Sequence, residues 1–166
     1  MAQDEDQWGA VEEAAELMLE GEFELALRAL RAVLEADPRN AYAYNYLGAT
    51  CYELGRHVEA RDAFRAAVRL APDYLGARVG LSQVLRDLGD AEASLDEAEE
   101  ALRRFPGDAD ALYAAALAHA ALGQNELARR RLHAFLETGP EFEVQAEVQA
   151  LLERLATPRR RDVPQA

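Results

Sequence analysis

Lysine is absent from the sequence. All 18 basic residues are arginine, against 31 aspartates and glutamates, so the formal net charge is −13. Binding to a nucleic-acid backbone requires clustered basic residues that release counterions. We therefore expect no nucleic acid among the partners. The arginine bias, together with abundant alanine, suggests a bacterial genome rich in GC.

Long apolar runs and cysteines are also scarce. No stretch approaches the roughly 20 apolar residues that a membrane span requires. The acidic start, from Asp4 to Asp6, lacks the positive charge of a secretory signal. Cys51 is the only cysteine, so neither an internal disulfide nor a cysteine cluster for a metal can form. We therefore predict a cytoplasmic protein in a reducing compartment, with no membrane span.

Residue combinations typical of catalysis are missing as well. The three histidines, His57, His119 and His133, are not spaced as metal ligands, and the sequence contains no glycine-rich phosphate loop. A catalytic thiol would need a nearby histidine and positive surroundings, which the sequence around Cys51 does not indicate. We therefore predict that the protein is not an enzyme and has no cofactor and no metal.

Glycine and proline recur with a single period along the chain. Two sets of residues are each spaced by 34 positions: Gly21, Gly55, Gly89 and Gly123, and Pro38, Pro72, Pro106 and Pro140. Glycine ends helices because, without a Cβ atom, it adopts the left-handed backbone conformation. Proline ends them because it lacks an N–H and clashes with the preceding turn. The two sets therefore predict four copies of a helix-turn-helix unit.

Residues 41–72 are the clearest copy of this unit. Seven residues have the order and spacing of the tetratricopeptide signature: Tyr44, Leu47, Gly48, Ala60, Phe64, Ala67 and Pro72. Cys51 lies where that signature usually has an aromatic residue. The chain therefore resembles the tetratricopeptide repeat (TPR) family. The resemblance implies an all-α fold, a right-handed TPR superhelix (α-solenoid) of four helix-turn-helix repeats plus a C-terminal capping helix.

The period also predicts the boundaries of the domain. We expect a disordered acidic leader at 1–6, the TPR domain at 7–156 and a flexible tail at 157–166. Within the domain, the expected repeats and capping helix are at about 7–40, 41–74, 75–108, 109–142 and 142–156. The first repeat is expected to have helices near 7–20 and 23–36.

Several residues near the ends of the domain depart from the signature or add to it. Ala10 and Glu13 replace bulky apolar residues in the first repeat, as expected of a terminal unit. Phe135 replaces a small residue in the fourth repeat and predicts altered packing against the segment that follows. That segment contains an apolar helical stripe that covers the last repeat or pairs with another chain: Val144, Val148, Leu151 and Leu155.

The family resemblance implies a concave face that binds a partner segment and is lined by the first helix of each repeat. On each helix the 34-residue frame selects positions i, i+3, i+7 and i+10, which lie on one face. The candidate partner-binding residues are Trp8, Val11, Met18, Tyr42, Asn45, Tyr52, Val79, Gln83, Arg86, Tyr113 and Leu117. Tryptophan and tyrosine are over-represented at binding hot spots. Asn45, Gln83 and Arg86 are expected to be available for the backbone or an acidic group of the partner.

The functional hypothesis is a protein-protein interaction adaptor or scaffold that binds an apolar or amphipathic segment of a partner in this groove. Two alternatives remain: a small bacterial chaperone of the type III secretion class that holds an aggregation-prone client, or a self-assembling TPR scaffold that forms homo-oligomers. The structural alternative to partner binding is that a tight superhelix covers part of this face itself. The acidic residues are interpreted first as a solvated surface and second as a docking patch for a basic partner.

Overall fold

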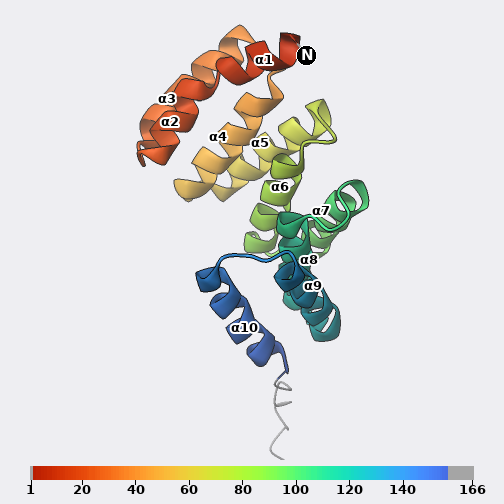
Figure 1. Cartoon of the computed structure of the whole chain (residues 1–166). Coiled ribbons are helices and arrows are strands. Elements are labelled where there is room, and N and C mark those ends of the chain that lie inside the picture. Colours follow the sequence, from red (N-terminus) through yellow and green to blue (C-terminus); the bar gives the residue numbers. More distant parts are fainter. Residues whose placement is uncertain (1, 157–166) are drawn as a thin grey trace, which may run out of the picture.

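The chain forms a stack of helix pairs along a curved axis (Figure 1). The structure, a computed structural model, describes the backbone of residues 2–156 and the side chains of residues 6–156. Its helices are α1 (Ala2–Gly9), α2 (Glu12–Leu19), α3 (Phe23–Ala36), α4 (Ala41–Glu53), α5 (His57–Leu70), α6 (Leu75–Asp87), α7 (Ala91–Arg104), α8 (Ala109–Ala121), α9 (Asn125–Glu137) and α10 (Phe142–Ala156). The predicted all-α solenoid is confirmed.

The first helix of every repeat ends in the same hydrogen-bonded turn. Gly55 has a φ angle of 72° and donates its N–H to the carbonyl of Tyr52 (2.9 Å). The N–H of Arg56 donates to the carbonyl of Cys51 (2.8 Å). These two bonds are those of a Schellman motif, which satisfies the last carbonyls of a helix. The motif recurs at the other three periodic glycines, Gly21, Gly89 and Gly123.

The N-terminal helix differs from the sequence prediction. Residues 2–6 belong to α1, whereas the sequence predicts a disordered leader there. Alanine, glutamine and glutamate are good helix formers, and a terminal turn needs no apolar residue, so the acidic composition is compatible with a helix. The helix predicted near 7–20 is also interrupted at Ala10 and Val11, which separate α1 from α2.

The interruption of the helix follows Gly9, and it directs the side chain of Val11 into the core. Glycine lowers the stability of a helix interior, and here the N–H of Val11 donates to the carbonyl of Trp8 (2.9 Å), only three residues back. In a continuous helix, Trp8 and Val11 would lie on one face. In the structure, Trp8 is 41% exposed, whereas Val11 is fully buried in a cluster with Leu30.

The core is a chain of three apolar clusters, as expected for a fold in which each repeat packs on its neighbours. The first cluster joins α2, α3 and α4 around Leu30. The second joins α3, α4, α5 and α6 around Phe64. The third joins α7, α8, α9 and α10 around Leu132. The core is therefore elongated, and its integrity depends on the contacts between successive repeats.

The capping helix α10 covers the end of the last repeat. Of the predicted apolar stripe, Val148 is buried in the third cluster, and Val144, Leu151 and Leu155 pack at its edge. Leu152, which was not part of the predicted stripe, is also buried there. Phe135 lies in the same cluster with 7% of its surface exposed. The phenylalanine that departs from the signature therefore packs in the same cluster as the helix that follows.

Phe64 on α5 is held between two glycines of neighbouring first helices. A Cβ atom at Gly48 on α4 would lie 2.7 Å from its ring, and a Cβ atom at Gly80 on α6 would lie 2.5 Å from it. Both distances are far shorter than carbon-carbon van der Waals contact. Since the ring is enclosed on both sides and 5% exposed, it cannot move away from one helix without approaching the other.

We predict that Gly80→Ala lowers the free energy of unfolding by about 1–3 kcal/mol, because the added methyl group overpacks the core against Phe64. This loss outweighs the gain of about 0.5–1 kcal/mol that alanine normally brings to a helix interior. Urea unfolding followed by circular dichroism measures the difference.

The matched control is Gly76→Ala on the same helix. A Cβ atom there has its nearest neighbour at 3.5 Å, in the ring of Tyr74, so the methyl group fits. This variant should be as stable as the wild type or slightly more stable. Equal stability of the Gly80 and Gly76 variants would contradict the proposed enclosure of Phe64.

Candidate binding groove

The first helices of successive repeats line one side of the solenoid. α4 contacts α6, and α6 contacts α8, whereas no comparable contact joins α5 to α7 among the described residues. The first helices are therefore closer together than the second helices. In a curved stack, the more closely spaced elements lie on the inner side, which is the concave face (Figure 1).

Two hollows on this side form one groove. The first, of about 420 Å³, is lined mainly by α4 and α6. The second, of about 240 Å³, lies between α6 and α8. Val79, Gln83 and Asp110 line both, so the two hollows adjoin and are treated together as one groove. Seven of the candidate partner-binding residues line the groove: Asn45, Tyr52, Val79, Gln83, Arg86, Tyr113 and Leu117.

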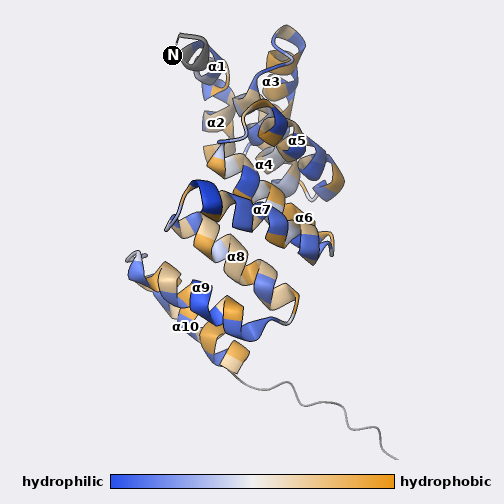
Figure 2. Cartoon of the chain, turned by 90° about the vertical axis from the view of Figure 1, so that its right-hand side faces the viewer, coloured by the Kyte–Doolittle hydropathy of each residue, from blue (hydrophilic) through white to orange (hydrophobic). Residues whose placement is uncertain are grey.

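The floor of the groove is formed by half-buried apolar and aromatic side chains. The ring of Tyr113 packs against Phe135 with centroids 5.3 Å apart, and Tyr52 stacks on His57 at 5.1 Å. Figure 2 shows α8 mostly pale or orange and the neighbouring α7 mostly blue. A helix that is apolar on all sides is usually buried. Here one side of α8 belongs to the core, while Tyr113 and Leu117 line the groove.

Three polar side chains of the groove have partners within the protein. The amide nitrogen of Asn45 donates to the hydroxyl of Tyr74 (3.0 Å), and the guanidinium of Arg86 pairs with Asp87 (3.2 Å). The hydroxyl of Tyr52 donates to the other carboxylate oxygen of Asp87 (2.5 Å). Asn45 and Arg86, which were expected to be available for a partner, therefore each hold one contact within the protein. Their availability for a partner stays a prediction.

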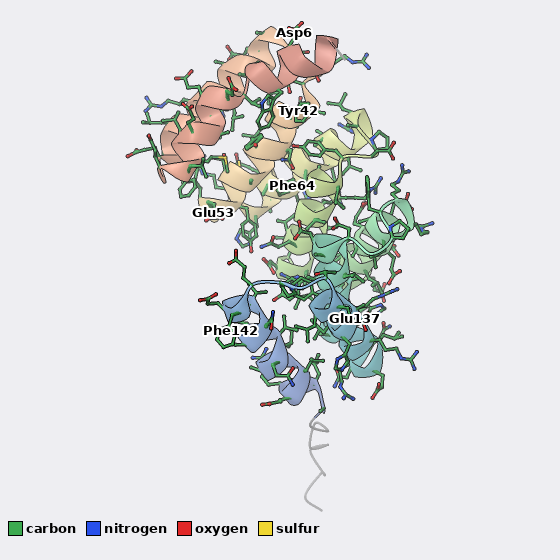
Figure 3. All side chains as sticks on the ribbon, in the orientation of Figure 1. Asp6, Tyr42, Glu53, Phe64, Glu137 and Phe142 are labelled. Atoms are coloured by element: carbon green, nitrogen blue, oxygen red, sulfur yellow. The ribbon has the colours of Figure 1, made fainter. Side chains whose placement is uncertain are left out.

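Several groove residues were not among the sequence candidates. Glu53 lies at the C-terminal end of α4, one position beyond the predicted face (Figure 3). Phe64 belongs to the core, yet it lines the groove wall together with Gly76 and Gly80. Glycine has no side chain, so these two glycines are the signal in the sequence that could have predicted an open groove wall at this place.

The remaining candidates lie outside the groove. Trp8, on α1, packs against Tyr42 and Tyr46 with ring centroids 5.8 and 5.9 Å away. Met18 is half-buried on α2. Val11 was wrongly predicted to contact a partner, since the interruption between α1 and α2 buries it completely.

A separate hollow, of about 530 Å³, lies in the first repeat between α1, α2 and α3. Its lining includes Ala10 and Glu13, the two residues that replace bulky apolar residues of the signature. The alanines of α3 form the opposite wall. The hollow therefore occupies the space that bulky apolar side chains fill in a repeat that matches the signature.

The histidines and the cysteine have structural surroundings. His119 is buried, with its ring nitrogens 2.6 Å from the Gln124 side-chain oxygen and 3.3 Å from a carboxylate oxygen of Glu99. Cys51 is buried in the second core cluster, and burial raises the pKa of its thiol. Among the described residues, no group of three or more potential ligands is arranged to hold a metal ion.

The family follows from a comparison with known sequences. A model of the tetratricopeptide repeat family matches residues 11–74 and 79–140, more than half of the chain. The chain belongs to the tetratricopeptide repeat family. TPR domains bind protein partners and are generally interaction modules without enzymatic activity. In the range that the structure describes, no helix has the length and apolar composition needed to cross a bilayer.

Two curated proteins illustrate the relationship. The chain is 32% identical over 127 residues to Protein FlbA of Caulobacter vibrioides. It is 36% identical over 81 residues to the tetratricopeptide repeat and J domain-containing co-chaperone DNJ1 of Cryptococcus neoformans. These matches cover 72% and 48% of this chain but only 21% and 15% of the two relatives. The chain thus spans less than a quarter of the length of either protein.

Solved structures show the same fold. A crystal structure of MamA protein superposes with a TM-score of 0.71 at 22% identity, covering 93% of this chain and 87% of that one. The thermophilic TPR protein TTC0263 of Thermus thermophilus gives a TM-score of 0.73 at 24% identity, covering 90% and 80%. At this level of identity, the likeness concerns the architecture of the helix pairs.

We predict that the groove tyrosine Tyr52 ionises above the usual tyrosine pKa of about 10. The hydrogen bond to Asp87 raises the pKa of Tyr52, and partial burial raises it further. Since the folded-state pKa is the higher one, this contribution to stability is complete below about pH 10 and is lost as the pH rises through the folded-state pKa.

Absorbance titration of tyrosinate measures this pKa, with Tyr52→Phe as the reference that isolates the signal of Tyr52. In Asp87→Asn the carboxylate acceptor is gone, so the pKa of Tyr52 should move back toward its usual value. An unchanged midpoint in Asp87→Asn would show that the hydrogen bond to Asp87 is not its main cause.

Proposed function

We propose that this TPR chain is an adaptor that holds an apolar or amphipathic segment of a partner protein in the groove between α4, α6 and α8. The observation on which the proposal rests is that large aromatic and aliphatic side chains on the floor of the groove remain partly exposed to solvent. Tyr52 and Tyr113 provide contact area with few rotatable bonds, which is characteristic of binding hot spots.

The charge of the protein supports a protein partner over a nucleic acid. The chain carries a net charge of −13 and has no lysine. The single arginine that lines the groove, Arg86, is paired with Asp87. A polyphosphate backbone would therefore meet no cluster of free cations in the groove.

Gly76 offers a way to obstruct the groove without disturbing the core. It lines the hollow between α4 and α6 and has a helical backbone, and a Cβ atom there has room. We predict that Gly76→Gln lowers the affinity for the partner at least tenfold, because a long side chain would project into the binding space. The melting temperature should stay at or slightly above that of the wild type, since glycine is unfavourable in helices.

Gly76→Ala is the matched control, because it makes the same backbone change without filling the groove. The partner is captured with the wild-type chain, identified by mass spectrometry, and titrated as a purified protein against all three chains by calorimetry. Equal affinities for the glutamine and alanine variants would refute binding in this groove.

A further inference from the structure

The chemistry of the groove specifies its occupant more closely than an amphipathic segment. This inference rests on the proposed function and concerns the conformation and charge of the partner. Two features carry it: the internal hydrogen bonds of the polar groove residues, and the carboxylates at the edge of the apolar floor. Figure 3 shows one of these acidic residues, Glu53, at the end of α4.

The first feature concerns the backbone of the partner. An extended peptide brings unpaired N–H and C=O groups that need partners when they leave water. In the groove, Asn45 donates to Tyr74, and Arg86 is paired with Asp87. The side chain of Gln83 lies close enough to the Tyr52 hydroxyl to lower its pKa slightly. A helix satisfies its own backbone groups, so a groove in which Asn45 and Arg86 already hold internal partners favours a helical occupant.

The second feature concerns charge. Glu53 and Asp110 line the groove and are exposed, and neither has an ion-pair or hydrogen-bond partner among the described residues. Asp110 lies in the first turn of α8, where an acidic side chain also interacts favourably with the helix dipole. The groove therefore presents two unpaired carboxylates, while the charge of its only arginine is compensated by Asp87.

We infer that the groove takes a cationic amphipathic helix, whose apolar stripe packs on Tyr52, Val79, Tyr113 and Leu117 and whose lysines or arginines reach Glu53 and Asp110. Helix-in-groove recognition uses apolar anchors at i, i+3, i+4 and i+7. Opposite charges beside such anchors fix the register and raise the association rate.

The test uses three designed peptides with one leucine stripe: a helix with lysine at the polar positions, its glutamate counterpart, and a lysine peptide whose helix is broken by proline. Fluorescence anisotropy should show binding of the lysine helix to the full chain. The glutamate and proline peptides should bind at least tenfold more weakly. Raising the salt concentration should weaken binding of the lysine helix, because exposed charges are screened.

Charge variants locate the effect. Glu53→Gln/Asp110→Asn should weaken binding of the lysine helix about three- to tenfold, the size expected for two exposed ion pairs. The control Glu92→Gln/Asp96→Asn removes two exposed, unpartnered acids from α7, one of them in a first helical turn. This control should leave the affinity unchanged.

Equal losses in the two double variants would overturn the inference, because attraction to the net negative charge alone would then explain the binding. Tight binding of the glutamate helix or of the proline peptide would overturn the charge or the helix assignment, respectively. If Gly76→Gln still abolished capture of the natural partner, the proposed function would survive either result. Capture that is insensitive to Gly76→Gln would remove the proposed function itself.

Discussion

The packing of one aromatic ring against two glycines determines how the middle of this solenoid is built. Phe64 on α5 reaches both α4 and α6 because Gly48 and Gly80 have no Cβ atom in its way. The first helices can therefore approach each other closely on the inner side of the stack. The missing side chains also open the wall of the groove, which is lined by Gly76, Gly80 and the edge of the buried Phe64 ring. Tight packing and the binding surface thus have the same cause.

The sequence predicted the helix pairs because their ends depend on local chemistry. A glycine with positive φ and two backbone hydrogen bonds is sufficient to end each first helix, and these requirements recur every 34 residues. The interruption between α1 and α2 was not predictable in this way. Its signal is one glycine, Gly9, and its outcome depends on the burial of Val11 against Leu30, a contact that the period does not encode.

The face of the groove was predicted better than its chemistry. Positions on a helix face follow from geometry, so residues such as Tyr52 and Leu117 were placed correctly on the first helices. The internal contacts of Asn45 and Arg86 were not predictable. Asn45 bonds to Tyr74, which lies 29 positions further along the chain, and Arg86 pairs with the adjacent aspartate only in a particular rotamer. The 34-residue period assigns positions on a helix face, but it does not predict which polar side chains form hydrogen bonds within the protein.

The hollow in the first repeat is a weaker candidate for partner binding than the groove. The hollow in the first repeat is open because Ala10 and Glu13 are too short or too polar to fill it. Five of its eleven lining residues are alanines, which offer little contact area to a ligand, and a terminal repeat is expected to have such weakened slots. The floor of the groove, in contrast, carries the tyrosines and the leucine that make strong contacts. For a repeat protein of this kind, the side chains that line a hollow therefore decide its role more than its volume does.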